Sequence, residues 1–178
     1  MNVAELDDEK LVARVCEARD EVAFRALYRR HTPALYGLAI RLMGVADPDV
    51  ADIVQDAWCR ASEALGRFRW NSALRTWLAG FVVNCCRERI RDRIRIRGDH
   101  TLPLDWRTAE YPADAKLHLA HAIASLAHGH REVLILHDVE GYTHEEVAAI
   151  LGIEPGTSKS QLSRARAAMR ILLKEKSA

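Results

Sequence analysis

Cationic, amide and hydroxyl side chains gather between Thr157 and Arg166, at a spacing that could contact DNA. Arginine can form two parallel hydrogen bonds to guanine and glutamine two to adenine, while lysine and arginine also bind phosphates. If this stretch is helical, its apolar face packs inward and the other positions are left for such contacts. The candidate DNA contacts are Thr157, Ser158, Lys159, Ser160, Gln161, Ser163, Arg164 and Arg166.

Two short helices joined by a tight turn would position these side chains. Thr143 and Glu146 have the spacing of a capping box, which begins a helix, and Gly152 marks the end of that helix. Thr157 or Ser158 is then expected to cap a last helix that runs to about Leu173. The pattern is that of a helix-turn-helix, with an ordinary helical hairpin and a solvated basic face as the alternative. The residues predicted to be buried in the last helix are Ser158, Leu162, Ala165, Met169 and Leu172, so Ser158 falls in both sets.

The net charge of +1 hides a strong segregation of charge along the 178 residues. Residues 1–66 hold 8 basic and 12 acidic side chains, and residues 67–99 hold 9 and 3. Residues 100–155 hold 3 and 9, and residues 156–178 hold 6 and 1. Two basic blocks that each follow an acidic block indicate two contacts with a polyanion, or else helix faces that are merely solvated.

The spacing of apolar residues predicts an all-α fold with two small helical domains. Residues 1–97 form the first domain and residues 114–178 the second, which contains the helix-turn-helix. Residues 98–113 contain two prolines and break the helical periodicity, so we expect a flexible linker there.

Three helices are expected in the first domain. Pro33 should kink the helix over residues 23–43 or begin a new one. Asp47 and Pro48 suit the cap and the first position of a helix that ends near residue 65. Asn71 or Ser72 can cap the third helix, whose apolar face is Leu74, Trp77, Leu78, Phe81, Val82 and Cys85. The second domain adds helices over residues 116–127 and 130–140.

One exposed stripe of the helix over residues 47–65 has a different chemistry. Asp52, Gln55, Asp56 and Cys59 follow one another at intervals of three and four residues, beside the apolar stripe. An acidic, amide-bearing stripe disfavours DNA and suits a basic groove on another protein. A solvated acidic face is the alternative.

The sequence does not indicate an enzyme, a cofactor or a metal centre. The four cysteines lack the spacing of a disulfide framework or a zinc site, and no histidine cluster is completed by a cysteine or carboxylate. No nucleophile–base–acid arrangement or phosphate-binding glycine loop is present. No apolar run reaches the roughly 20 residues that span a bilayer, and the acidic start is no signal peptide. We therefore expect a reduced cytoplasmic protein without membrane insertion.

The run EEVAAILGIEPGTSKSQLSRAR, residues 145–166, resembles the fourth domain of bacterial sigma factors. More narrowly, it is similar to the extracytoplasmic-function (ECF) group, whose helix usually reads G-T-V-K-S-R-L-x-R-A-R. Residues 52–58 resemble the polymerase-binding motif of the second sigma domain, and residues 68–84 resemble its promoter-melting and minus-ten-reading segment. Ser158 and Gln161 depart from the family, which usually has valine and arginine there. These departures predict looser packing under the last helix and an altered base preference.

The resemblance implies a transcription initiation factor that binds core RNA polymerase and directs it to promoters. Asp52, Gln55, Asp56 and Cys59 would bind the coiled coil of the beta-prime subunit, and the beta subunit is a second expected contact. The helix-turn-helix would read the minus-thirty-five element, and an anti-sigma factor is an expected partner. Melted DNA needs aromatic surfaces flanked by cations. The expected minus-ten contacts are Arg67, Phe68, Arg69, Trp70, Arg75, Asn84, Arg87 and Arg91, with Arg89 as a further phosphate contact.

Two other functions fit part of the pattern. A stand-alone helix-turn-helix regulator would bind duplex DNA without polymerase, and gel shifts with and without core enzyme separate it from a sigma factor. A helical adaptor that binds only proteins would tolerate alanine at Lys159, Arg164 and Arg166, whereas a DNA reader should lose affinity and salt dependence. Within the first domain, Trp77 is expected in the core, while Phe68 either stacks on bases or joins the core.

Overall fold

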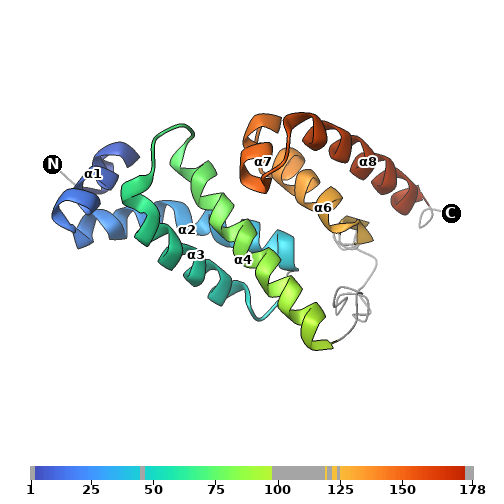
Figure 1. Ribbon diagram of the computed structural model, residues 1–178, viewed down its shortest axis with the longest axis horizontal. Coiled ribbons are helices and arrows are strands. Elements are labelled where there is room, and N and C mark those ends of the chain that lie inside the picture. The colour runs from blue at the N-terminus through green and yellow to red at the C-terminus, as the bar shows by residue number, and fades with distance from the viewer. Residues whose placement is uncertain (1–2, 45–46, 98–118, 120–121, 124, 175–178) are drawn as a thin grey trace.

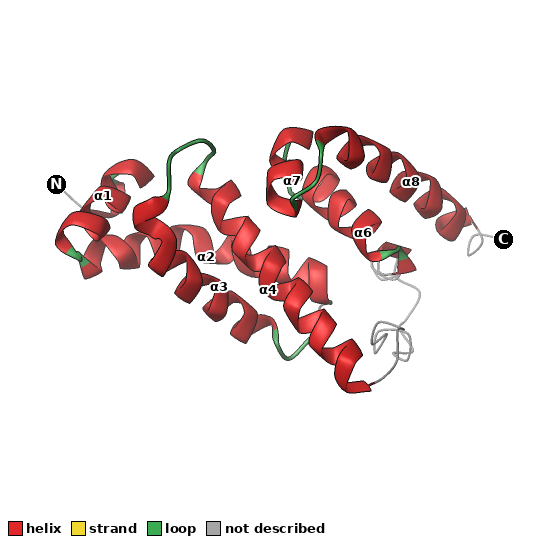
Figure 2. Ribbon diagram, in the orientation of Figure 1, coloured by secondary structure: helices red, strands yellow, loops and turns green. Residues whose placement is uncertain are grey.

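The computed structural model describes residues 3–44, 47–97, 119, 122–123 and 125–174, and every regular element within them is a helix (Figures 1 and 2). The all-α fold predicted from the sequence is confirmed. The linker expected at residues 98–113 and most of the helix expected at residues 116–127 lie outside the described residues.

Four helices build the N-terminal bundle: α1 (Asp8–Ala18), α2 (Glu21–Met43), α3 (Val50–Ala64) and α4 (Leu74–Arg97). Short 3₁₀ turns, η1 (Val3–Glu5) and η2 (Leu65–Arg67), precede α1 and follow α3. The side chains of Asp7 and Asp20 accept hydrogen bonds from first-turn amides, which starts α1 and α2. The core lies between α2, α3 and α4 and includes the fully buried side chains Leu27, Leu38, Ile53, Leu78, Val82 and Val83.

Two predicted helix starts in this bundle are wrong, whereas Pro33 lies inside one continuous helix, α2, and does not begin a new one. Asp47 does not cap α3, which begins at Val50. Its carboxylate instead accepts a hydrogen bond from the amide of Asp49 and pairs with Arg93 of α4. Finally, α4 begins at Leu74, where the carbonyl of Ala73 accepts the amide of Trp77, rather than after a cap at Asn71 or Ser72.

The C-terminal domain contains α6 (His128–Leu134), the π-helical turn η4 (Ile135–Val139), α7 (His144–Leu151) and α8 (Pro155–Lys174). The predicted capping box is present: the Thr143 hydroxyl accepts from the Glu146 amide at 3.2 Å, and the Glu146 carboxylate accepts from the Thr143 amide at 2.9 Å. Gly152 ends α7 with φ +68°, a left-handed conformation that suits glycine. This positions α7 and α8 as a helix-turn-helix.

The start of α8 and the helix before α7 differ from prediction. α8 begins at Pro155 rather than after a cap at Thr157 or Ser158, because a proline at the first position has no amide hydrogen to leave unpaired. The Glu154 carbonyl then accepts the amide of Ser158. The helix expected over residues 130–140 begins at His128 and widens into a π-helical turn, in which the Glu140 amide reaches back to the carbonyl of Ile135.

The two domains pack against each other along α4 and α7, with η4 also against α2 (Figure 1). Arg75, Thr76 and Arg87 of α4 contact the second domain. The outer faces of α3 and α8 point away from this contact (Figure 1).

Candidate nucleic-acid interface

The stripe Asp52, Gln55, Asp56 and Cys59 forms an exposed ridge on α3, opposite the buried Ile53, Val54 and Ala57. Beside it, Arg60 of α3 forms two hydrogen bonds to the Glu88 carboxylate of α4, at 2.9 and 2.7 Å. These bonds from Arg60 hold the pKa of Glu88 below its usual range. The Arg60–Glu88 ion pair thus links α3 to α4 beside the ridge, and the ridge offers acidic and amide groups to a partner.

The connector between α3 and α4 presents aromatic and cationic groups together. Arg67 and Arg69 are exposed, Trp70 is 41% exposed, and the Phe68 and Trp70 rings lie 4.7 Å apart between centroids. Trp70 has φ +57°, a conformation that is uncommon for a bulky residue and costs backbone strain. The fold therefore holds an aromatic side chain out of the core at an energetic cost.

Aromatic rings continue from this connector along α4. Phe68 lies 5.0 Å from Trp77, and Trp77 lies 4.7 Å from Phe81, between ring centroids. Trp77 and Phe81, both predicted to be core residues, are only half-buried, because the buried face of α4 is centred on Leu78 and Val82. Phe68 is also half-buried, so it packs on the core and borders the surface at once.

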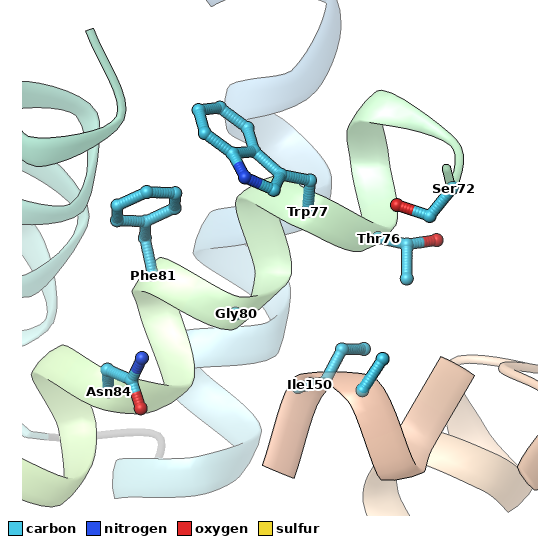
Figure 3. A pocket seen from close by; sticks show the side chains of 8 residues that line it. Ser72, Thr76, Trp77, Gly80, Phe81, Asn84 and Ile150 are labelled. Atoms are coloured by element: carbon cyan, nitrogen blue, oxygen red, sulfur yellow. The ribbon is translucent and has the colours of Figure 1, made fainter. Parts of the chain in front are cut away.

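A hollow of about 250 Å³ lies beside these rings, between α4 and α7 (Figure 3). Trp77, Phe81 and the exposed Asn84 line it from α4, and Ile150 lines it from α7. Figure 3 shows the Asn84 amide and the two rings on one side of α4. The hollow is thus lined by two aromatic rings and by an amide that can form hydrogen bonds.

The α4 arginines predicted to hold phosphates differ in their exposure and in their acidic partners. Arg91 is exposed, and Arg89 lies 3.8 Å from the carboxylate of Asp49. Arg75 and Arg87 hold carboxylates of the second domain, Glu140 and Glu132. Sequence reasoning missed these two acidic partners, since nothing local in the sequence links them to α4.

On α8, the side chains predicted to read duplex DNA divide into exposed and buried ones. Lys159, Ser160, Ser163, Arg164 and Arg166 are exposed, and Thr157 and Gln161 are half-buried. Ser158 is 0% exposed, so its inclusion among the DNA contacts is wrong. It lies on the inner face with Leu162, Ala165 and Met169, as the periodicity predicted, while Leu172 is only half-buried.

A polar network under α8 explains how a serine fills this apolar position. The Ser158 hydroxyl lies 2.9 Å from Nδ1 of His144, and the His144 ring stacks on His137 with centroids 4.2 Å apart. His137 contacts Asp138, which accepts two hydrogen bonds from Arg166, at 2.9 and 2.6 Å. The bonds from Arg166 hold the pKa of Asp138 below its usual range. A serine at an apolar position was the signal that a polar partner lies beside it.

The thiols of Cys85 and Cys86 are both buried. Burial raises the pKa of Cys85, and it raises the pKa of Cys86 to about 12. The thiolate is the form of cysteine that reacts with oxidants. Oxidation sensing by this pair is therefore disfavoured relative to packing in the core.

Within the described part of the chain, no three histidine, cysteine or acidic side chains converge as a metal site would require. The histidines His118 and His121, which are three residues apart in the sequence, lie outside that part. No described helix has both the length and the apolar character to cross a bilayer.

Comparison with known proteins gives consistent matches. Residues 27–96 match the family model for Sigma-70 region 2, and residues 117–169 match that for Sigma-70, region 4. The ECF RNA polymerase sigma factor SigM of Mycobacterium tuberculosis is 36% identical over 171 residues, covering 94% of this chain and 84% of that protein.

Two solved structures share the fold. The sigma factor RpoE in complex with the anti-sigma factor NepR from Bartonella quintana has a TM-score of 0.71 and 30% identity, covering 85% of this chain and 96% of that chain. CnrH in complex with the cytosolic domain of CnrY has a TM-score of 0.70 and 30% identity, covering 94% and 97%.

Two helical domains, a helix-turn-helix and exposed cationic side chains are typical of a DNA-binding protein. The matched models and relatives show that the chain belongs to the ECF group of bacterial sigma factors. Sigma factors are non-enzymatic transcription initiation factors, so the general function of the chain is to direct RNA polymerase to promoters.

Proposed function

We propose that the chain binds the beta-prime and beta subunits of core RNA polymerase and uses one domain for each promoter element. Residues 1–97 would serve the minus-ten element and residues 114–178 the minus-thirty-five element, joined by a linker at residues 98–113. The observation that carries this proposal is the separation of three exposed surfaces: the acidic ridge on α3, the aromatic connector and the cationic face of α8.

The first domain would capture the melted minus-ten strand. Successive bases stack on aromatic rings, and cations follow the backbone of a single strand. Phe68 and Trp70 supply the rings, with Arg67 and Arg69 beside them, and Asn84 supplies an amide for a base edge. Arg75, Arg87 and Arg91 would hold phosphates farther along α4. The acidic ridge at Asp52, Gln55, Asp56 and Cys59 would bind the coiled coil of the beta-prime subunit.

The second domain would place α8 in the major groove of the minus-thirty-five element. Lys159 and Arg164 are exposed for phosphates or base edges, and Arg166 would exchange Asp138 for DNA. Thr157, Ser160, Gln161 and Ser163 complete the set, with Gln161 suited to adenine. Ser158 supports α8 from inside rather than touching DNA.

We also infer that the chain is held by an anti-sigma factor in the cytoplasm, where polymerase and promoters are found. RpoE, at 30% identity over nearly its whole length, was solved in complex with the anti-sigma factor NepR, and CnrH with the cytosolic domain of CnrY.

Run-off transcription on a genomic promoter library tests the proposal. Core polymerase with the chain should initiate at a defined subset of promoters, while either component alone should not. Replacing Arg164 by alanine should reduce initiation and flatten its salt dependence, with alanine at Arg25 of α2 as the control. Gel shifts that show duplex binding by the chain alone, unchanged by core enzyme, would instead support a stand-alone regulator.

A further inference from the structure

Asp138 of η4 shares one carboxylate oxygen between an arginine and a histidine. Its Oδ1 accepts a hydrogen bond from Nη2 of Arg166 at 2.6 Å and lies 2.9 Å from Nδ1 of His137, while its Oδ2 accepts from Nε of Arg166 at 2.9 Å. The side chains of Asp138 and His137 are each 27% exposed, and that of Arg166 is 51% exposed. The arginine is therefore the partner that can leave toward solvent, whereas the carboxylate and the imidazole stay within the domain.

The move of Arg166 to DNA would leave the charge of Asp138 without its cation. A carboxylate that is partly shielded from water is costly to leave unpaired, and it repels a phosphate brought close to it. An aspartate carboxyl ordinarily titrates near pH ~4, so Asp138 stays ionised at neutral pH after the arginine has left. The exchange therefore calls for a second cation at Asp138.

His137 is placed to supply that cation. Histidine changes its charge between about pH 5 and 8, and a carboxylate in contact with it favours the charged form. In the structure, the guanidinium of Arg166 already neutralises this carboxylate and opposes a second positive charge beside it. Once Arg166 leaves, both effects favour the protonated imidazole.

The second histidine of the stack is less suited to take the proton. His144 stacks on His137 with ring centroids 4.2 Å apart, and its Nδ1 lies 2.9 Å from the hydroxyl of Ser158. Burial, followed by the charge of His137, lowers the pKa of His144. Because two positive rings in contact repel each other, one proton is gained, on the ring that contacts the carboxylate.

The charged groups around the stack come from several elements. They are Asp138 on η4, Glu145 on α7, and Lys159 and Arg166 on α8. From α2, which also packs on η4, Arg41 pairs with Glu140. Asp138 is the acidic group in contact with His137, so the protonation of His137 depends on what occupies Asp138.

We propose that binding of the minus-thirty-five element is linked to the uptake of one proton by His137, which replaces Arg166 on Asp138 when Arg166 moves to DNA. A solvent proton adds to the neutral imidazole, so the charge of the carboxylate stays balanced. This inference rests on the proposed exchange of Asp138 for DNA by Arg166. It deepens that function by making His137 and Asp138 the residues that set the pH dependence of promoter affinity.

The direction of the effect follows from proton linkage. A group that is more protonated in the complex than in the free chain strengthens binding as pH falls. Uptake of one proton changes affinity by at most about tenfold per pH unit. Promoter affinity should therefore rise about three- to tenfold between pH 8 and pH 6.

Fluorescence anisotropy of a labelled promoter duplex, with the full chain and core polymerase, measures this affinity at constant salt. The wild type should show the rise between pH 8 and pH 6. His137→Gln should bind like the wild type at pH 8 and lose the rise. His130→Gln, which changes a half-buried histidine of α6 outside this cluster, is the matched control and should keep it.

Asp138→Asn tests the same coupling from the side of the carboxylate. Asparagine cannot hold Arg166 in an ion pair, so this variant should bind about two- to fivefold more tightly than the wild type at pH 8 and show no rise. Glu145→Gln, which removes an exposed charge from α7, should keep the wild-type rise. If either His137→Gln or Asp138→Asn loses helical circular dichroism, the other decides.

A wild type whose affinity does not change with pH would overturn the proton uptake, and so would an equal rise in the wild type and in either of these two variants. Failure of the proposed function looks different, because the chain with core polymerase would then bind no promoter specifically at any pH. A wild type that initiates at promoters, with an affinity that is flat between pH 8 and pH 6, sinks the proton uptake alone.

Discussion

His144 and Ser158 form a partly buried polar contact at the base of α8. Their side chains lie 2.9 Å apart, and Ser158 is fully enclosed. A buried polar group that loses its partner costs more than the hydrogen bond itself contributes. This pair therefore fixes α8 against α7 through chemistry that a valine at residue 158 would not provide.

Replacing Ser158 by alanine should lower the free energy of unfolding by about 1 kcal/mol, because the hydrogen bond between the Ser158 hydroxyl and Nδ1 of His144 is lost. Ser160 on the exposed face is the matched control, and its replacement by alanine should change stability by about 0.5 kcal/mol or less. Urea denaturation monitored by circular dichroism measures both. Equal effects of the two substitutions would show that the buried contact contributes nothing.

Stability should also depend on pH through His144. Burial, followed by the nearby charges of His137, Lys159 and Arg166, lowers the pKa of His144 from 6.5. The unfolded chain then binds the proton more tightly, so the stabilising effect is present above pH 6.5 and is lost as pH falls through the lower folded pKa. Chemical denaturation between pH 8 and pH 5 should show this loss, and His144→Gln should reduce its slope. An unchanged slope would contradict the assignment.

Elements with local signals were predictable, and those fixed by distant contacts were not. Thr143, Glu146 and Gly152 lie within ten residues, so the bounds of α7 follow from spacing alone. The start of α3 does not, because Asp47 is drawn to Arg93, 46 residues away. Likewise, Trp77 has core spacing, yet the rotation of α4 on its neighbours leaves that ring half-buried.

At Trp70, in the connector before α4, a glycine variant should be more stable than an alanine variant. Because Trp70 has φ +57°, glycine fits its backbone better than alanine. Trp70→Gly should therefore be about 1 kcal/mol more stable than Trp70→Ala, opposite to their order within a helix. Thermal denaturation measures the difference, and both variants should bind a single-stranded minus-ten oligonucleotide more weakly than the wild type. Greater stability of the alanine variant would show that the left-handed conformation is not maintained.

The ridge on α3 should act on polymerase and not on the fold. Replacing Asp52 and Asp56 by arginine reverses two exposed charges, so stability should change by about 0.5 kcal/mol or less per site, while affinity for core enzyme should fall at least tenfold. Glu17→Arg on α1, an exposed acidic residue outside the ridge, is the control. Native-gel or interferometric binding to core polymerase reads the effect. Full affinity after the charge reversal would place the polymerase contact elsewhere.

At the scale of the whole molecule, two helical domains and their order could be predicted, but their contact could not. Periodicity and three ordered motifs are properties of neighbouring residues. The partners Arg87 and Glu132 lie 45 residues apart, and Thr76 and Glu146 lie 70 apart, with no spacing rule that links them. The sequence predicted that Arg75 and Arg87 contact DNA, whereas in the structure they pair with Glu140 and Glu132.

Permanganate reactivity of thymines in the minus-ten element of a promoter from the run-off screen tests the central claim most directly. Reactive thymines mark melted DNA, and they should appear only when core polymerase and the chain are present together, with simultaneous protection of the minus-thirty-five element. Reactivity should fall when Trp70 is replaced by alanine, while the protection stays. A promoter that stays double-stranded with both proteins bound, or that melts equally well without the chain, would contradict the account.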